Sequence, residues 1–235
     1  MTQESTEDLT TEIIKKSKEI MKLLKRDNIE ISEIDNYHLY PIADNDTPKL
    51  SADRLEYSLS NALFIYRLLD LASIKEIYDD IEIQTNEEKE IELGFKTKKN
   101  ARNFVKVTSR LSVIYREDRT RYSMQLIADI LKRLSDENKM SRKDLYELKE
   151  SEVINIIESS KYNDIFNIWK NAKKVKISKE EPQNVYYVHH GAKIRYIDPL
   201  FNGERISKCC KIANKMIENN LSYDMNNYVY LDFNF

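Results

Sequence analysis

Glycine and proline are scarce in this chain, and this scarcity constrains its fold more than any other feature of the sequence. The 235 residues include three Gly and four Pro, well below the average usage of about 7% and 5%. Loops that cradle phosphate in the Walker or Rossmann manner need several glycines close together, so these two kinds of nucleotide site are excluded. Because Lys, Glu, Ile and Leu are abundant, we expect a mainly α-helical chain with short connections.

The charge balance and the apolar runs restrict the partners. The chain carries 38 Lys and Arg against 40 Asp and Glu, a formal net charge of −2. Nucleic-acid binding needs clustered positive charge, so no nucleic-acid partner is expected. No apolar run approaches the ~18 residues of a membrane span. The polar, acidic N-terminus is neither a signal peptide nor a transit peptide, and the two adjacent cysteines offer no disulfide framework, so we expect a cytoplasmic protein without membrane contact.

Hydrophobic periodicity predicts a helical body in the first 172 residues. Alternating apolar residues around a polar stretch predict one β-hairpin near residues 81–95. In the helix after residue 119, Met124, Ile127, Leu131 and Leu134 define the expected apolar side. The expected helices cover residues 6–26, 52–70, 73–78, 97–116, 119–136, 143–148, 151–159 and 164–173.

The last third of the sequence has a different character. Short apolar and aromatic runs predict strands at residues 175–177, 185–188, 194–197 and 228–231, with a helix over 204–219. We therefore expect a mainly α fold with a helical part over residues 1–172 and a smaller α+β part over residues 173–235.

One segment stands out as a candidate site. Asp53, Tyr57 and Asn61 recur every four residues in the helix predicted after Ser51, which aligns a carboxylate, a phenol and an amide along one face. Asp53 lies in the first turn, where the helix dipole stabilises an anion, and a carboxylate is a good hard ligand for a divalent metal. From spacing alone, a capped amphipathic helix with its polar residues in solvent is the favoured interpretation, and the resemblance described below favours a site instead.

The other residues that could carry chemistry form no recognisable site. The histidines are His38, in a proline-containing connection, and His189 and His190, in the continuation of the strand predicted at 185–188, where neighbours point to opposite faces. No two of them have the spacing of a metal-binding pair, and the sequence has no nucleophile-elbow motif.

The stretch Ser51-Ala52-Asp53-Arg54-Leu55-Glu56-Tyr57 resembles a segment of the HD-domain phosphohydrolases, in the branch similar to deoxynucleoside triphosphate triphosphohydrolases. The resemblance implies an HD-like helical body in which Asp53 is the last ligand of a metal site, while Tyr57 and Asn61 face the nucleotide sugar. It implies a divalent metal (Mn, Fe, Zn or Mg) and a nucleotide or related phosphate ester as the substrate, attacked at phosphorus by metal-activated water.

The sequence departs from this family in three ways. The family usually has Asp where this chain has Asn61, and many relatives carry His-Glu where this chain has Gln3-Glu4. The family's His and His-Asp metal ligands have no counterpart, since the sequence has no His-Asp dipeptide. We therefore expect the C-terminal portion of such a hydrolase, incomplete, inactive and without bound metal as this chain alone. A truncated or split gene product, a fragment completed by a separate chain and a degenerate relative all agree with the sequence. The protein partners that we expect are further copies of this chain, in a homo-oligomer, or a separate N-terminal chain.

This interpretation has one alternative and leads to two further expectations. A non-catalytic helical module that binds a partner protein or a nucleotide is the alternative function. If ligand-bearing helices are missing, the apolar face that carries Ile13, Ile20 and Leu24 should be exposed. Arg54 is the basic residue nearest to Asp53 that could bind phosphate.

Overall fold

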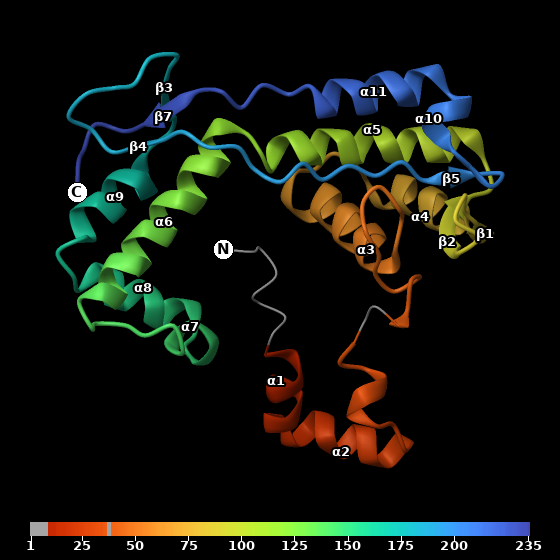
Figure 1. Ribbon diagram of the computed structural model, residues 1–235, viewed down its shortest axis with the longest axis horizontal. Coiled ribbons are helices and arrows are strands. Elements are labelled where there is room, and N and C mark those ends of the chain that lie inside the picture. Colours follow the sequence, from red (N-terminus) through yellow and green to blue (C-terminus); the bar gives the residue numbers. More distant parts are fainter. Residues whose placement is uncertain (1–8, 37–38) are drawn as a thin grey trace. The chain divides into compact units, whose positions relative to one another are not determined.

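A computed structural model describes residues 9–36 and 39–235 of the chain. Residues 1–105 and 197–214 belong to one compact unit, unit 1, and residues 106–196 and 215–235 to the other, unit 2. Helices dominate both units, as Figure 1 shows, so the prediction of a mainly α fold with a smaller α+β contribution is confirmed. The predicted boundary at residue 173 lies inside unit 2, and each unit combines two separate stretches of chain.

The first helix of unit 1 is divided in two. Helix α1 (Thr10–Lys16) ends at Ser17, whose extended backbone breaks the helix, and the Ser17 hydroxyl then caps α2 (Lys18–Asp27) by accepting the Ile20 N–H at 3.3 Å. A short 3₁₀ turn, η1 (Ile31–Glu33), follows. The first residues of the predicted helix, 6–8, lie outside the described residues, as do Gln3, Glu4 and His38.

The apolar face expected on these helices is exposed only in part. Ile13 is 50% exposed and Ile20 is 38% exposed, whereas Leu24 is buried. Within residues 9–36 and 39–235, no helix combines the length and the apolar character that crossing a membrane requires.

The next helical segment carries the candidate site residues. Helix α3 (Ala52–Ser60) begins after Ser51 and continues directly into a single π-helical turn, η3 (Asn61–Ile65). The predicted helix over 52–70 therefore ends five residues early. Helix α4 (Leu71–Asp79) starts after Asp70, whose carboxylate accepts the Ser73 N–H at 2.8 Å.

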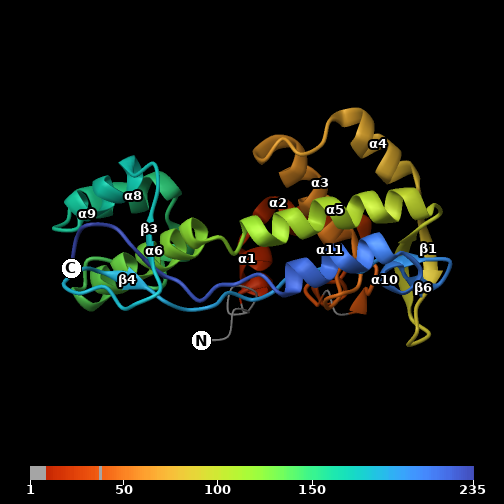
Figure 2. The ribbon, with the colours of Figure 1, turned by 90° about the horizontal axis from the view of Figure 1, so that it is seen from above.

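The predicted hairpin is confirmed and forms half of a four-stranded sheet. Strands β1 (Ile81–Thr85) and β2 (Ile91–Phe95) pair antiparallel, with Ile83 opposite Leu93. Strand β2 then pairs in parallel with β5 (Leu200–Phe201), and β5 pairs antiparallel with β6 (Glu204–Arg205), so the order is β1-β2-β5-β6. Figure 2 shows β6 beside the hairpin. Residues over 100 positions apart thereby join one sheet.

Two helices run through both units. Helix α5 (Lys98–Ile114) buries Phe104, Val107 and Leu111, as its periodicity predicts. After the short helix α10 (Ile206–Cys209), helix α11 covers Lys211–Leu221. The boundary between the units crosses α5 after Val105 and α11 after Asn214.

Unit 2 is built around helix α6 (Asp118–Asp136). Four residues at successive intervals of four, Tyr122, Leu126, Ile130 and Leu134, are fully buried and form the centre of its core. Met124, expected on the apolar side, is instead 67% exposed. The core also includes residues of α8 (Glu150–Glu158), α9 (Asn163–Asn171) and an antiparallel sheet in the order β3-β7-β4, formed by Lys176–Ser178, Tyr228–Tyr230 and Tyr187–Val188. Helix α7 (Asp144–Glu147) is a single turn.

A buried arginine in unit 2 joins the ends of two helices. Arg116, only 1% exposed, donates from Nε to the Ser112 carbonyl in the last turn of α5 at 3.0 Å. Its Nη2 donates to the Asn220 carbonyl in the last turn of α11 at 2.7 Å and also to the Asn220 side chain. Burial lowers the pKa of the Arg116 guanidinium below its usual value. The partial negative charges at the carboxyl ends of two helices explain how this cation is tolerated.

The sequence prediction fails over residues 194–209. Residues 194–197 do not form a strand, and the predicted helix over 204–219 begins only at Ile206 and is interrupted at Cys210. The helix starts late because residues 204 and 205 belong to a tight hairpin between β5 and β6. Asn202 and Gly203 both have positive φ, 54° and 75°, which is the two-residue Asn-Gly turn that suits antiparallel strands.

Candidate functional site

The N-terminus of helix α3, which carries Asp53, is held in place by several contacts. The Ser51 hydroxyl accepts the Arg54 N–H at 3.3 Å and caps the helix. The first backbone N–H groups of the helix, those of Ala52 and Asp53, donate to the carbonyls of Ile42 at 2.8 Å and Ala43 at 3.0 Å. The preceding loop therefore fixes the position of the first helical turn.

Asp53, Tyr57 and Asn61 lie along this helical segment as the spacing predicted. Asp53 and Tyr57 belong to α3, and Asn61 is the first residue of η3. Successive members are about 6 Å apart along the axis. Asp53 is exposed, whereas Tyr57 and Asn61 are half-buried. On the opposite side, Leu55 and Leu59 are buried in the core of unit 1.

Arg54 is engaged with the loop before the helix. One Nη group donates to the Lys49 carbonyl at 3.1 Å, and the other donates to the Asn45 carbonyl. The guanidinium thus joins the start of α3 to residues 45–49, so its observed role is structural.

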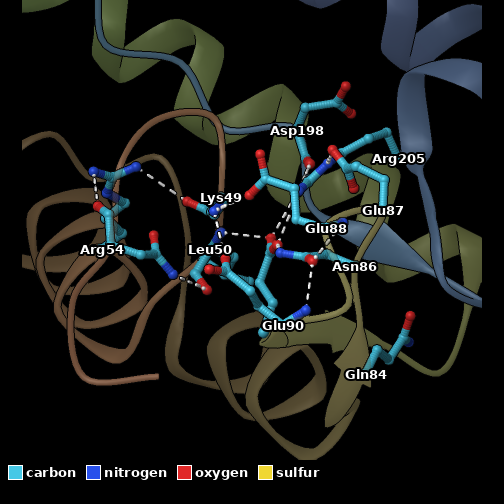
Figure 3. Close-up of polar contacts among 12 residues, drawn as sticks. Lys49, Leu50, Arg54, Gln84, Asn86, Glu87, Glu88, Glu90, Asp198 and Arg205 are labelled. Atoms are coloured by element: carbon cyan, nitrogen blue, oxygen red, sulfur yellow. Dashed lines mark hydrogen bonds and ion pairs between the residues drawn. The ribbon is translucent and has the colours of Figure 1, made fainter. Parts of the chain in front are cut away.

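A buried ion pair between Glu92 and Arg205 supports the same region. Figure 3 shows Arg205 beside Glu87, with Leu50 and Arg54 on the side of α3. The Glu92 side chain is 1% exposed and the Arg205 side chain 5%. Arg205 donates from Nη1 to Glu92 Oε1 at 2.7 Å and from Nη2 to Oε2 at 2.9 Å, a bidentate geometry. The pair joins β2 to β6 across the sheet.

Glu92 also accepts two further hydrogen bonds. Its Oε1 accepts the Leu50 N–H at 3.0 Å, and its Oε2 accepts from Asn86 Nδ2 at 3.2 Å. Leu50 is fully buried and directly precedes the cap residue Ser51. One carboxylate therefore links the hairpin, the C-terminal segment of unit 1 and the loop that leads into α3.

The outer part of this network consists of more exposed charges. Arg205 Nε donates to Glu87 at 2.9 Å, which lowers the pKa of that carboxyl. Burial opposes the charged state of Arg205, but its hydrogen bonds to Glu92 and Glu87 outweigh this effect, and the pKa of the guanidinium is raised. Lys49 contacts Glu88 at 2.5 Å and Glu90 at 2.7 Å, and these bonds raise the pKa of its ammonium group.

The network around Glu92 has a structural role. Four donors already occupy the two oxygens of this carboxylate. Sequence reasoning did not identify this pair, because Glu92 and Arg205 are 113 positions apart. The available signal was a charged residue inside an otherwise apolar strand, which needs a buried partner.

Asp53 is the predicted metal ligand that the structure describes. Asp53 offers one oxygen donor of the right chemistry, but residues 9–36 and 39–235 contain no group of three His, Cys, Asp or Glu side chains arranged to hold an ion. His189 and His190 follow β4 instead of lying within it. The His189 ring stacks on Tyr228 at 3.9 Å between centroids, and His190 bonds the Gly191 carbonyl.

No family model, no curated protein and no solved structure matches this chain.

Proposed function

We propose that this chain is the C-terminal portion of a metal-dependent phosphohydrolase of the HD-domain type that acts on nucleotides or related phosphate esters. The observation that carries the proposal is the row formed by Asp53, Tyr57 and Asn61 on α3 and η3, with the carboxylate exposed in the first helical turn. The loop contacts and the Glu92 network hold the start of this helix, and a fixed position is what a ligand-bearing residue requires.

In this proposal each residue of the row has a separate role. Asp53 supplies one carboxylate oxygen to a divalent metal, a role that suits an anion at a helix N-terminus. Tyr57 and Asn61 donate hydrogen bonds to the sugar of the nucleotide. When bound, the metal would supply an activated water as the nucleophile. Further ligands are needed, and these would come from a polypeptide segment that carries the His and His-Asp motifs.

The test begins with the DNA immediately upstream of the coding sequence. A reading frame with His and His-Asp motifs would be expressed together with this chain, either fused or as a second polypeptide. We expect bound Mn, Fe, Zn or Mg by elemental analysis and phosphate release from deoxynucleoside triphosphates, whereas residues 1–235 alone bind no stoichiometric transition metal.

Variants of the reconstituted protein separate the roles. Asp53→Asn should abolish metal binding and hydrolysis, while Tyr57→Phe should mainly raise KM. Asp79→Asn removes another exposed helical carboxylate and serves as the matched control, with activity unchanged. Hydrolysis that is indifferent to Asp53→Asn would contradict the proposal.

The alternative is a non-catalytic helical module that binds a partner protein or a nucleotide. Large apolar side chains that remain exposed after α3, such as Phe64 at 76%, favour it. If the reconstituted protein binds a nucleotide with the affinity reduced by Tyr57→Phe but releases no phosphate, this alternative is the better description.

A further inference from the structure

Four large apolar side chains of unit 1 that directly follow the candidate site in the sequence are exposed. Phe64, Ile65, Leu68 and Leu71, which we call the apolar patch, are exposed by 76%, 65%, 38% and 71%. They occupy the last turn of η3, the connection to α4 and the first residue of α4. Four large apolar side chains within eight residues are thus left in contact with solvent.

Backbone hydrogen bonds hold the apolar patch in one conformation. The Ala62 carbonyl accepts the N–H of Leu68 at 2.7 Å and that of Leu69 at 3.3 Å, so the connection folds back on η3. The Asn61 carbonyl accepts the Tyr66 N–H at 2.9 Å, and Asp70 caps α4. A surface that is already ordered loses little conformational entropy when it is covered.

The area of the apolar patch is in the range of an interface core. At about 200 Å² for a fully exposed large side chain, the four exposed fractions amount to roughly 500 Å² of mostly apolar surface. This is near the upper end for the largest apolar patch on a monomer. A standard stable interface buries about 800 Å² on each partner, so the patch supplies more than half of that area.

The charges around the apolar patch are balanced. Arg67 and Asp70 are both exposed within the same stretch, and on α4 Lys75 pairs with Asp79 at 2.5 Å. Glu76 of α4 is also exposed and pairs with Lys99 of α5 at 2.6 Å. Three bases therefore stand against three acids. A surface of this kind has no net charge to attract a polyanion, and it does not repel an identical copy of itself, because a two-fold axis can bring each base toward an acid of the other copy.

We propose that the apolar patch is the interface between two copies of this chain, related by a two-fold axis. This inference does not depend on the proposed hydrolase function. Phe64 lies eleven residues beyond Asp53, about 16 Å along the helical axis, so a second copy on the apolar patch leaves the Asp53 end of α3 open.

The test measures the mass of the purified chain over a range of concentrations by light scattering coupled to size exclusion and by sedimentation equilibrium. We expect a species of about 56 kDa, twice the 27.9 kDa of one chain. Leu71→Glu should weaken association at least about tenfold, since each copy would bring an unpaired carboxylate into the interface. Glu is well tolerated in the first turn of a helix, so α4 should stay folded.

Two more variants complete the design. Phe64→Glu combined with Leu71→Glu should give a monomer at every concentration, with an unchanged circular dichroism spectrum. Met124→Glu introduces the same charge at another exposed helical position, 67% exposed on α6 of unit 2, and should leave the dimer intact. A wild-type chain that is monomeric throughout, or a dimer that survives the double substitution, would overturn the proposal.

Discussion

Replacing the buried carboxylate of Glu92 should destabilise unit 1 strongly. In Glu92→Gln the side chain keeps its shape but loses its charge, and an amide N–H₂ group then faces the donors of Arg205. Removing one partner of a buried ion pair costs about 3–5 kcal/mol, because the other charge stays buried without its counterion. Arg205 keeps its bonds to Glu87 and to the Asp198 carbonyl. We therefore expect about 3 kcal/mol, the lower end of this range.

The assay is urea-induced unfolding followed by far-ultraviolet circular dichroism. Glu88→Gln is the matched control, since it removes an exposed partner of Lys49 on the same hairpin, and it should cost less than about 1 kcal/mol. The double variant Glu92→Gln/Arg205→Met should be more stable than either single variant, because neither charge is then left alone. A cost for Glu92→Gln no greater than that of the control would refute this account of the network.

Three further predictions concern the pH response, the helix ends and the hairpin turn. Hydrogen bonds from Lys161, first among its partners, lower the pKa of Glu137 to about 2; the stability that its carboxylate contributes is therefore complete above pH ~4.5 and is lost as the pH falls toward 2. Acid titration of urea unfolding, followed by the fluorescence of Trp169 in unit 2, should show a smaller loss over this window in Glu137→Gln. Arg116→Met should cost about 2–4 kcal/mol in the same fluorescence assay, because buried carbonyls at two helix ends lose their donor; a cost below about 1 kcal/mol would contradict this role. Gly203→Ala should lower the free energy of unfolding, followed by circular dichroism, by about 1 kcal/mol, since Ala tolerates the φ of 75° poorly. An unchanged or increased free energy of unfolding would contradict this prediction.

Local patterns predicted the local structure well. The 3.6-residue spacing located α5 and α6 within a few residues, and the two-residue alternation located the hairpin. The row of Asp53, Tyr57 and Asn61 was also accessible from spacing alone. Ser17 was a signal that the prediction overlooked, because a serine within a helical pattern can end one helix and cap the next.

The remaining features depend on contacts between distant parts of the chain. The parallel pairing of Gly94 with Leu200 cannot be read from periodicity, which carries no information about which strands meet. The two-residue turn at Asn202 and Gly203 was visible as an Asn-Gly pair, but the helical pattern of the following residues obscured it. The hydrogen bond from the Leu50 N–H to Glu92, which supports the start of α3, could not be predicted either, because it also joins distant parts of the chain.

The parallel pairing of β2 with β5 affects the chain while it is being synthesised. At about 5–20 residues per second, the ribosome needs roughly 6–23 s to add the 113 residues that separate Glu92 from Arg205. During this time β2 has one open edge and a carboxylate without its counterion, and open strand edges invite pairing with other chains. Unit 1 can therefore complete its sheet only after the whole first stretch of unit 2 has left the ribosome, and the order of synthesis makes the hairpin the segment most in need of protection in a nascent chain.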